Sequence, residues 1–443
     1  MVNKVEPRIL QGFSELLPGE QIAYNKMYDK IRSVYERFGF LPIDTPVLEY
    51  SDVLLAKAGG ETEKQIYRFS KGDADLAMRF DLTVPLARYV AMHRNDLPFP
   101  FKRYHMAKVY RGERPQKGRF REFCQCDIDV IGSDELDLVY DAEMPAVIYN
   151  VFTELDIGKF TIRINNRKVL GGFFEWLGIA DKATDIMRTI DKLEKIGAER
   201  TRAELVKLEI DEKTVDKIIS FIGISGNCDE IISALRGIGC DNEKFLTGVD
   251  ELDVVVGYIR DFGVPDDYFT LDLTIARGLD YYTGTVYETK IDAAPEFGSV
   301  CSGGRYDDLT GYYTDQKLPG IGISIGLTRL FSQLKEYGMI KAETTSTADV
   351  LILPMDRSAL TYSINAAKEL RKAGIPTDVY YLDKGFKPKM KYANRIGVPF
   401  VAIIGESEMA ENKITLKNMT DGSQQTLPVT EAAEAIAKAQ TKG

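Results

Sequence analysis

The sequence predicts an α+β fold: a large antiparallel sheet, a helical insertion within it, and a separate α/β domain toward the C-terminus. Three patterns lead to this prediction. Two alternating apolar runs are joined by a basic loop, a later stretch has only helical periodicity, and the final part alternates strand and helix patterns. At 443 residues, 44% apolar and 28% charged, the chain has the composition of a globular protein of about three domains.

Residues 1–166 are expected to form the first part of the sheet domain. Apolar spacing predicts a helix over 21–38, and Pro46 keeps the segment that follows extended, because proline bars helix. A second helix is expected over 82–93, where Thr83 can cap its first turn.

The centre of the sheet is expected to be a long hairpin. Alternating runs at 102–113 and 121–132 are joined by the basic loop 114–120. A helix is predicted over 138–152, and residues 167–263 then show helical periodicity broken by glycine turns. That block is interpreted as an inserted helical subdomain.

Residues 264–340 are expected to complete the sheet domain. Strand character returns at 269–291 and around the double glycine at Gly303, and the glycine-rich segment 320–326 is predicted to open a helix that runs to about Tyr337. The glycines of that segment lack the spacing of a dinucleotide-binding motif, so we interpret them as positions of close backbone packing.

A polar linker is expected at 341–347, followed by an α/β domain at 348–443. The elements predicted for this domain are strands at 350–354, 377–381 and 398–405, a helix at 358–373, and a basic helical stretch between the last two strands.

Composition excludes several classes of protein. The net charge of −10 argues against a protein that coats nucleic acid nonspecifically, although it leaves room for a tRNA partner. The five cysteines form no CxxC pair, and with only His93 and His105 beside them no zinc site is expected. Both histidines are expected to be structural. There is neither a long apolar run nor a signal peptide, so we expect a cytoplasmic protein that is not in a membrane.

Arginines at strand ends and glycine turns are the main candidates for chemistry. The chain has no GxxxxGK[ST] sequence, so a phosphate site would have to be built differently from a P-loop. Several guanidinium groups could converge on one triphosphate, and the alternative for each is a surface ion pair. The residues considered are Arg111, Glu113, Arg119, Arg121, Arg277 and Arg329.

These motifs resemble those of class II aminoacyl-tRNA synthetases of the histidyl-tRNA synthetase family. The stretch 110–123 resembles motif 2 of that class, and the stretches 277–287 and 302–307 resemble the two signature sequences of the family. Residues 320–330 are similar to motif 3, and the strand around Pro46 is similar to motif 1. The resemblance implies a class II antiparallel-sheet catalytic domain, with an anticodon-binding module at the C-terminal end.

The resemblance also implies the reaction and its reagents. Histidine would be activated with ATP and Mg²⁺ to histidyl-adenylate and then transferred to the 3′ end of tRNA(His) by a homodimer formed through motif 1. Arg111 and Arg329 would bind the ATP phosphates, Glu113 would contact adenine, and Phe123 would stack on it. Arg277 would hold the α-phosphate and the substrate carboxylate during catalysis.

Six positions match the family's histidine pocket. Asp81, Thr83 and Gln125 would bind the ammonium group, Tyr282 and Asp129 would bind the two ring nitrogens, and Tyr281 would line the pocket. Many bacterial members carry Glu at positions 81 and 129, where this chain has the shorter Asp.

Two further regions match tRNA-binding positions. In the loop, Arg114 and Gln116 match residues that meet the acceptor end of tRNA(His). The C-terminal domain carries basic residues beside aromatic ones, suited to backbone phosphates and a stacked base, or to a plain solvated face. They are Lys384, Lys387, Lys389 and Lys391, with Phe386 and Tyr392.

Three other functions compete with a histidine-specific synthetase. One is a synthetase-like regulatory subunit of ATP phosphoribosyltransferase, and another is a binding protein that keeps the fold without turnover, such as a polymerase accessory subunit or a tRNA sensor. The third is a class II synthetase for a different amino acid. The intact 277–287 stretch and the C-terminal domain argue against the first.

Overall fold

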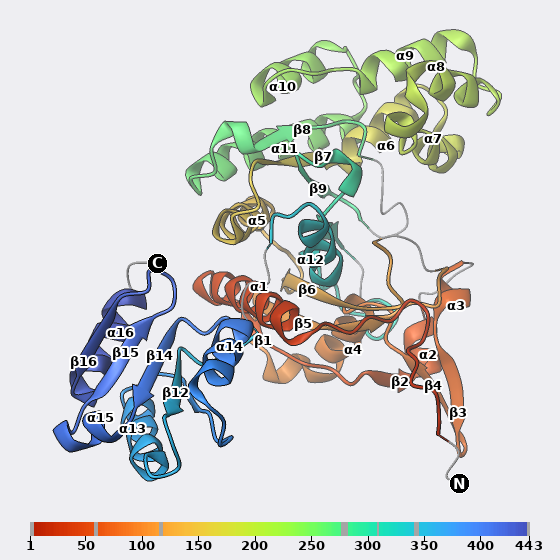
Figure 1. The fold of residues 1–443 in the computed structure, drawn as a ribbon. Coiled ribbons are helices and arrows are strands. Elements are labelled where there is room, and N and C mark those ends of the chain that lie inside the picture. The colour runs from red at the N-terminus through yellow and green to blue at the C-terminus, as the bar shows by residue number, and fades with distance from the viewer. Residues whose placement is uncertain are drawn as a thin grey trace. The chain divides into compact units, whose positions relative to one another are not determined.

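The computed structural model describes residues 4–56, 61–114, 118–275, 282–307, 310–340 and 345–440. The chain divides into two compact units, one made of Met1–Ser14 and Met27–Met339 and the other of Glu15–Lys26 and Ile340–Gly443 (Figure 1).

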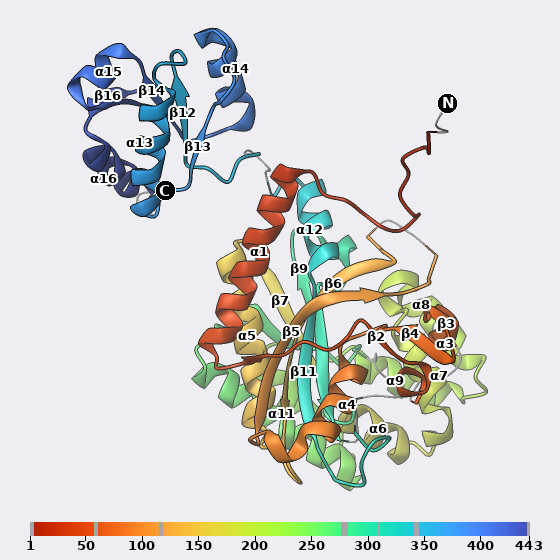
Figure 2. The ribbon, with the colours of Figure 1, turned by 90° about the horizontal axis from the view of Figure 1, so that it is seen from below.

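The core of the first unit is a mixed sheet in which eight strands of the described residues run side by side (Figure 2). The order is β1-β5-β6-β11-β10-β9-β7-β8, and neighbours are antiparallel except at the parallel pairs β1–β5 and β7–β8. The strands are β1 (Leu41–Pro42), β5 (Phe101–Tyr110), β6 (Glu122–Ile131), β7 (Phe160–Asn166), β8 (Phe269–Leu271), β9 (Thr285–Ile291), β10 (Cys301–Tyr306) and β11 (Gly320–Gly326). The predicted sheet is confirmed.

The predicted central hairpin is also confirmed. Strands β5 and β6 pair from Phe101 opposite Ile131 to Tyr110 opposite Glu122. Because side chains alternate across a strand, the odd-numbered residues of β6 from 125 to 129 share one face of the sheet. The even-numbered residues, Cys126 among them, lie on the other face and are buried.

The glycine-rich segment 320–326 differs from the prediction. It is the strand β11 between β6 and β10, and only afterwards does helix α12 (Leu327–Glu336) begin. A Cβ on Gly322 would lie 2.1 Å from Asp129 Oδ1, and one on Gly303 would lie 2.1 Å from the Gly322 carbonyl oxygen. The glycines therefore allow close approach, as predicted, and their low strand propensity concealed a strand.

The predicted strand over 269–291 is likewise divided. The described part of it contains the short strands β8 and β9, which both pair with β7.

Helix α4 (Thr83–His93) confirms the helix predicted over 82–93. In the described residues it is preceded along the chain by a second, antiparallel sheet of three strands. Its order is β2-β4-β3, and its strands are β2 (Leu48–Tyr50), β3 (Arg68–Lys71) and β4 (Ala74–Met78). The short helices α2 (Ser51–Leu55) and α3 (Glu61–Gln65) lie between β2 and β3 in sequence.

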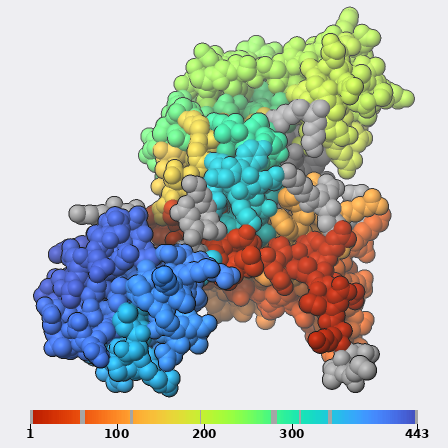
Figure 3. All heavy atoms as spheres, in the orientation of Figure 1, coloured from red at the N-terminus to blue at the C-terminus, as the bar shows by residue number. Residues whose placement is uncertain are grey.

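Helices α1 (Pro18–Arg37) and α5 (Val139–Leu155) match the helices predicted near the N-terminus and after the hairpin. The block from 167 to 263 is helical, as expected, and its side chains gather in one region (Figure 3). Its helices are α6 (Arg167–Trp176), α7 (Ala183–Ile190), α8 (Leu193–Val206), α9 (Glu212–Ile222), α10 (Cys228–Gly237) and α11 (Glu243–Asp261). The 3-10 turns of the first unit are η1 (Arg94–Asp96), η2 (Ala180–Lys182), η3 (Asp266–Tyr268) and η4 (Pro295–Phe297).

Glycines let α6 and α11 pack closely. A Cβ on Gly172 of α6 would lie 2.3 Å from the Phe245 backbone nitrogen, and one on Gly248 of α11 would lie 2.7 Å from the Val169 nitrogen. Since both neighbours are backbone atoms, neither can move aside alone.

The second unit has a five-stranded sheet of order β13-β12-β14-β15-β16 in its described residues, parallel at β13-β12-β14 and antiparallel beyond. Its strands are β12 (Val350–Pro354), β13 (Thr377–Val379), β14 (Phe400–Ile404), β15 (Ile414–Asn418) and β16 (Gln424–Leu427), and its helices are α13 (Leu360–Lys372), α14 (Phe386–Ile396), α15 (Glu406–Glu411) and α16 (Val429–Gln440). The predicted strand and helix alternation is confirmed as far as β14.

Two alanine substitutions in α11 test the close packing against α6. Gly248→Ala should lower the free energy of unfolding by about 1–3 kcal/mol, because its methyl group overpacks the helix contact. Gly257→Ala, in open space on the same helix, should raise it by about 0.5–1 kcal/mol through helix propensity. Thermal unfolding of both variants gives the comparison, and equal shifts would contradict the packing argument.

Candidate active site

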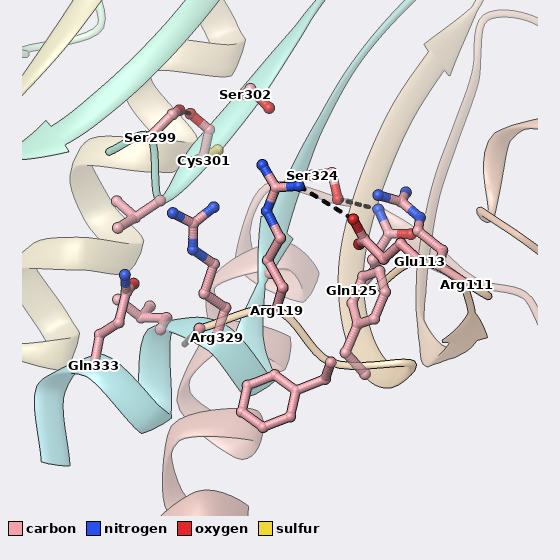
Figure 4. A pocket seen from close by; sticks show the side chains of 16 residues that line it. Arg111, Glu113, Arg119, Gln125, Ser299, Cys301, Ser302, Ser324, Arg329 and Gln333 are labelled. Atoms are coloured by element: carbon pink, nitrogen blue, oxygen red, sulfur yellow. Dashed lines mark hydrogen bonds and ion pairs between the residues drawn. The ribbon is translucent and has the colours of Figure 1, made fainter. Parts of the chain in front are cut away.

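A cavity of about 380 Å³ opens on the sheet face that carries the odd-numbered residues of β6. The loop end of the β5–β6 hairpin, strands β10 and β11, and the first turns of α12 surround it (Figure 4). It is lined by Arg111, Glu113, Gly118, Arg119, Phe120, Phe123, Gln125, Ser299, Val300, Cys301, Ser302, Ser324, Gly326, Arg329, Leu330 and Gln333.

Arg111 is held rigidly at the hairpin end. Its Nε donates to the Phe80 carbonyl oxygen over 3.2 Å, and its guanidinium lies 4.4 Å from the centre of the Phe80 ring and 5.0 Å from that of Phe123. Burial lowers the pKa of Arg111, while the nearby carboxylates of Asp81 and Glu113 act in the opposite direction. A stacked, partly desolvated guanidinium is well suited to bind an anion.

The ion pair between Arg119 and Glu113 is held less firmly than Arg111. Arg119 Nη1 donates to Glu113 Oε2 over 3.2 Å, and the Arg119 side chain is 57% exposed. An exposed pair of this kind contributes little to stability, so either partner can turn to a ligand at small cost.

Arg329 faces the same cavity from α12. Its Nη2 donates to the Phe297 carbonyl oxygen, which also accepts from Gln333 Nε2 over 3.3 Å. Arg111 and Arg119 from the hairpin loop and Arg329 from α12 therefore line one cavity, and guanidinium groups brought together in this way suit an anionic ligand.

The other predicted arginines have different positions. Arg121 does not line the cavity, since its Nε donates to the Glu113 carbonyl oxygen over 3.0 Å and its backbone nitrogen to the Gly12 oxygen over 2.7 Å. It braces the hairpin end. Arg277 lies outside the described residues, as do Tyr281 and Gln116, while Arg114 is described and exposed.

Beyond the arginines, β6 carries a buried polar row. Gln125, Asp127 and Asp129 are 9%, 3% and 4% exposed. Gln125 Nε2 donates to Ser324 Oγ over 2.7 Å (Figure 4). Burial raises the pKa of Asp127 to about 7, against the lowering effects of Arg103 and of a Ser324 hydrogen bond.

Asp129 is fixed from two sides. The hydroxyl of Tyr306 donates to its Oδ1 over 2.8 Å, and the fully buried Arg103 forms an ion pair with its Oδ2. Burial raises the pKa of Asp129 to about 6, and Arg103 is the largest opposing influence. Removing the Arg103–Asp129 ion pair from water costs free energy, and the hydrogen bond from Tyr306 is needed to offset that cost.

Asp81 and Thr83 meet at the start of α4. Asp81 Oδ1 accepts from the backbone nitrogens of Thr83 over 3.2 Å and Val84 over 3.0 Å, and burial raises the Asp81 pKa. Asp81 therefore caps the helix, where the sequence suggested Thr83. The reason is positional: Thr83 is the first residue of the helix, and the free N–H groups of the first turn are met by the side chain of Asp81, two residues earlier.

Tyr282 completes this buried polar group. Burial raises its pKa, with further raising by Asp129 and Asp127. A Cβ on Gly304 would lie 2.8 Å from the Tyr282 ring, so the strand glycine makes room for the ring. Of the predicted histidine pocket, Asp81, Asp129 and Tyr282 interact electrostatically, and Gln125 lies on the same face of β6 as Asp129.

The 302–307 stretch stabilises the fold as well as lining the cavity. Arg305 Nε donates to both oxygens of the buried Asp141, at 3.1 and 3.0 Å, and its Nη1 to the Leu136 carbonyl oxygen at 3.0 Å. Its guanidinium is therefore fully engaged with α5 and the segment before it. Removing one partner of such a buried pair typically costs about 3–5 kcal/mol.

His105 and His93 lie apart from the cavity lining. His105 Nε2 is 2.9 Å from Asp44 Oδ1, and burial lowers the pKa of His105 to about 4. His93 contacts the ring of Tyr89. In the described part of the chain no group of three or more His, Cys, Asp or Glu is arranged to hold a metal ion, and no helix there is long and apolar enough to cross a membrane.

One lysine of the predicted basic cluster is unsuited to phosphate. Lys389 is 2% exposed, and its Nζ donates to the carbonyl oxygens of Pro354 and Met355. The amphipathic helix α14 buries this side chain, because its position falls on the face toward the sheet. Lys384, Lys387 and Lys391 are exposed.

The prediction left out several residues that surround the site. Alternation along β6 could have shown Asp127, since it lies between two chosen positions on the same face. Arg103, Ser324 and Gln333 carry no local signal, because they reach the site only through strand pairing and helix packing.

An antiparallel sheet with an arginine-lined cavity, interrupted by helices and followed by an α/β unit, defines a class II aminoacyl-tRNA synthetase. The family model described as histidyl-tRNA synthetase matches residues 12–330, and the model described as anticodon binding domain matches residues 349–439. The chain therefore belongs to the histidyl-tRNA synthetase family.

Individual relatives agree with this. The chain is 54% identical to the histidine–tRNA ligase of Clostridium tetani over 98% of this chain and 99% of that one, and 49% identical to that of Stenotrophomonas maltophilia over 94% of each. It is similar to the crystal structure of histidyl-tRNA synthetase from Nostoc sp. PCC 7120, with a TM-score of 0.93 and 42% identity over 98% of this chain and 100% of that one.

Proposed function

We propose that the chain is a histidine–tRNA ligase: it activates histidine with ATP to histidyl-adenylate and pyrophosphate, then transfers histidine to the 3′ end of tRNA(His). The observation that carries this proposal is the buried polar group of Asp81, Gln125, Asp129 and Tyr282 directly beside the arginine-lined cavity. One compartment suits the ammonium group and ring of a small amino acid, and the other suits a triphosphate.

In the first step a carboxylate oxygen of histidine attacks the α-phosphorus of ATP, and the bond to the β-phosphate oxygen breaks as pyrophosphate leaves. Arg111 and Arg329 would bind the phosphates. Arg277 would hold the α-phosphate and the substrate carboxylate, where negative charge rises in the transition state. Glu113 would contact the adenine end and Phe123 would stack on the base. The rigid stacking of Arg111 on Phe123 supports this arrangement.

Histidine would bind along the buried row. Asp81, Thr83 and Gln125 would take the ammonium group, and Tyr282 and Asp129 would take the ring nitrogens, with Tyr281 lining the pocket. A donor and an acceptor suit a ring that bears one of each. The side chain of Asp129 is shorter than that of Glu. Its ion pair with Arg103 and its hydrogen bond from Tyr306 would fix the position of the carboxylate relative to the histidine ring.

Mg²⁺ would enter with the triphosphate, which supplies most of its oxygen ligands. No protein side chain is assigned to this ion, and no zinc ion is needed for the reaction. The role of the enzyme in translation places it in the cytoplasm.

The tRNA would meet the protein at two places. Arg114 and Gln116, in the hairpin loop, would contact the acceptor end. In the domain from 348 to 443, Lys384, Lys387 and Lys391 would bind backbone phosphates near Phe386 and Tyr392. The exposed positions of these lysines and rings support this role.

The proposed domain limits follow the chemistry. The catalytic domain would comprise 1–166 and 264–340 around the helical insertion 167–263, with a linker at 341–347 before the anticodon-binding domain.

A homodimer would form over motif 1. One face of the β2-β4-β3 sheet is apolar and exposed: Leu48 is 43%, Tyr50 62% and Phe69 42% exposed. Tyr50 and Phe69 both pair with Leu76 of β4, so they lie on the same face. An exposed apolar face of this kind is typical of an interface, and a second copy of the chain is the occupant that the motif 1 resemblance implies.

ATP–pyrophosphate exchange with each amino acid separately tests the proposed reaction. Histidine alone should give turnover, since a site with buried polar groups rejects side chains that leave those groups unpaired by about 10⁴–10⁵. Exchange with another amino acid instead would reject the pocket assignment, and no exchange with any would favour a regulatory or binding protein.

Arg277→Ala tests the catalytic arginine in the same assay. The variant should fold with an unchanged melting temperature and lose adenylation by at least about a hundredfold, because it lacks the cation that stabilises phosphoryl charge. Near-normal exchange would remove that role from Arg277.

Light scattering tests the dimer. The chain has a mass of 49.7 kDa, and the particle in solution should have about twice that mass. Tyr50→Asp together with Phe69→Asp should release monomers, because the substitutions put charges into an apolar contact. The matched control Val254→Asp, on the exposed side of α11, should leave the mass unchanged, and a wild-type monomer would contradict the proposal.

A further inference from the structure

One buried carboxylate in the polar row has no role in the reaction described above. Asp127 lies on β6 between Gln125 and Asp129, on the same face of the sheet, and is 3% exposed. In register it faces Ser324 of β11 on one side and His105 of β5 on the other. Burying a carboxylate costs free energy of folding unless the group is paired.

The hydrogen bonds around Asp127 leave two acceptors open. Ser324 Oγ accepts from Gln125 Nε2 over 2.7 Å, and the Ser324 hydroxyl also bonds Asp127. In these hydrogen bonds the Gln125 amide is engaged through its nitrogen. Gln125 Oε1 and Asp127 Oδ1 are then both buried without a hydrogen-bond partner among the described residues. Buried acceptors of this kind are rare unless a ligand or water satisfies them.

The charge of the region also calls for a cation. Arg103 is the cation with the largest effect on the pKa of Asp127, and it already forms an ion pair with Asp129. The ionisable groups that act on Asp127 or respond to it are mostly acidic or neutral. They are Tyr35, Asp81, Arg103, Arg111, Cys126, Asp129, Tyr282 and Cys301. Without a ligand, burial outweighs the arginines and raises the pKa of Asp127 to about 7.

We infer that Asp127 is a further substrate-binding residue, whose open carboxylate oxygen accepts an N–H of the α-ammonium group of histidine beside Gln125 Oε1. The inference rests on the proposed function and adds a residue to its histidine site. An ammonium group brings three donors and one positive charge, which match the two open acceptors and the unbalanced carboxylates. The ring remains with Asp129 and Tyr282.

Asp127→Asn tests the inference, because it keeps the shape of the side chain and removes its charge. In ATP–pyrophosphate exchange the KM for histidine should rise by about ten- to a hundredfold, the range expected when a hydrogen bond to a charged group is lost, while the KM for ATP stays within about twofold. The matched control is Glu143→Gln. Glu143 is a buried carboxylate of α5 paired with Lys102, whose side chain lies on the other face of β5, so the histidine KM should not change.

Two inhibitors separate the ammonium from the ring. Histidinol keeps the ammonium group and the imidazole, and its inhibition constant should worsen in Asp127→Asn as much as the histidine KM. Imidazolepropionate has the ring and carboxylate without the ammonium, and its constant should be the same in both proteins. An equal loss for imidazolepropionate, or an unchanged histidine KM in a variant of an active enzyme, would overturn the inference.

Melting of the ligand-free proteins distinguishes binding from folding. A buried acid with a raised pKa destabilises the folded protein as pH rises through that pKa. Asp127→Asn should therefore melt higher than the wild type at pH 8, with the difference shrinking toward pH 5. A lower melting temperature at pH 8 would show that the carboxylate serves the fold and would reject its role as a ligand. Wild-type protein without histidine-dependent exchange would instead reject the proposed function, and this assignment with it.

Discussion

Burial of charged side chains within a sheet face is the constraint on which the site depends. Asp129 is a buried carboxylate of β6, held by the fully buried Arg103 and by the Tyr306 hydroxyl. Gly322 opposite makes the space, since any Cβ there would collide with the carboxylate. The pairing of β6 with its neighbours, the glycine at position 322 and the Arg103–Asp129 ion pair therefore depend on one another. Loss of any one would remove support from the other two.

The two halves of the site solve opposite electrostatic problems. The arginine-lined half holds cations apart by stacking and by backbone carbonyl oxygens, as for Arg111 on Phe80 and Phe123. The polar row holds carboxylates that burial makes reluctant to ionise. Each half is unfavourable alone and gains from a ligand of opposite charge. The ammonium group of an amino acid and an anionic nucleotide bound side by side would relieve both.

Elements carried by local periodicity could be predicted well. The hairpin of β5 and β6, helix α4, the helical block and the first part of the C-terminal domain followed from alternation, helical spacing and turn residues. Strand β11 was mistaken for a helix start, because its glycines serve a neighbouring carboxylate and say little about local conformation. Lys389 was mistaken for a phosphate ligand, because charge in a sequence does not reveal which helix face is buried.

The sequence by itself determined the family, because residue type and spacing carry that information along the chain, and its motifs predicted which residues would contact ATP and histidine. Only the tertiary structure decided which groups are paired and which are left open. Arg103 pairs with Asp129 of the neighbouring strand, Arg305 binds Asp141 of a helix remote in sequence, and Asp127 keeps an oxygen unpaired among the described residues. Pairing depends on distances between segments remote in sequence, and no local pattern encodes those distances.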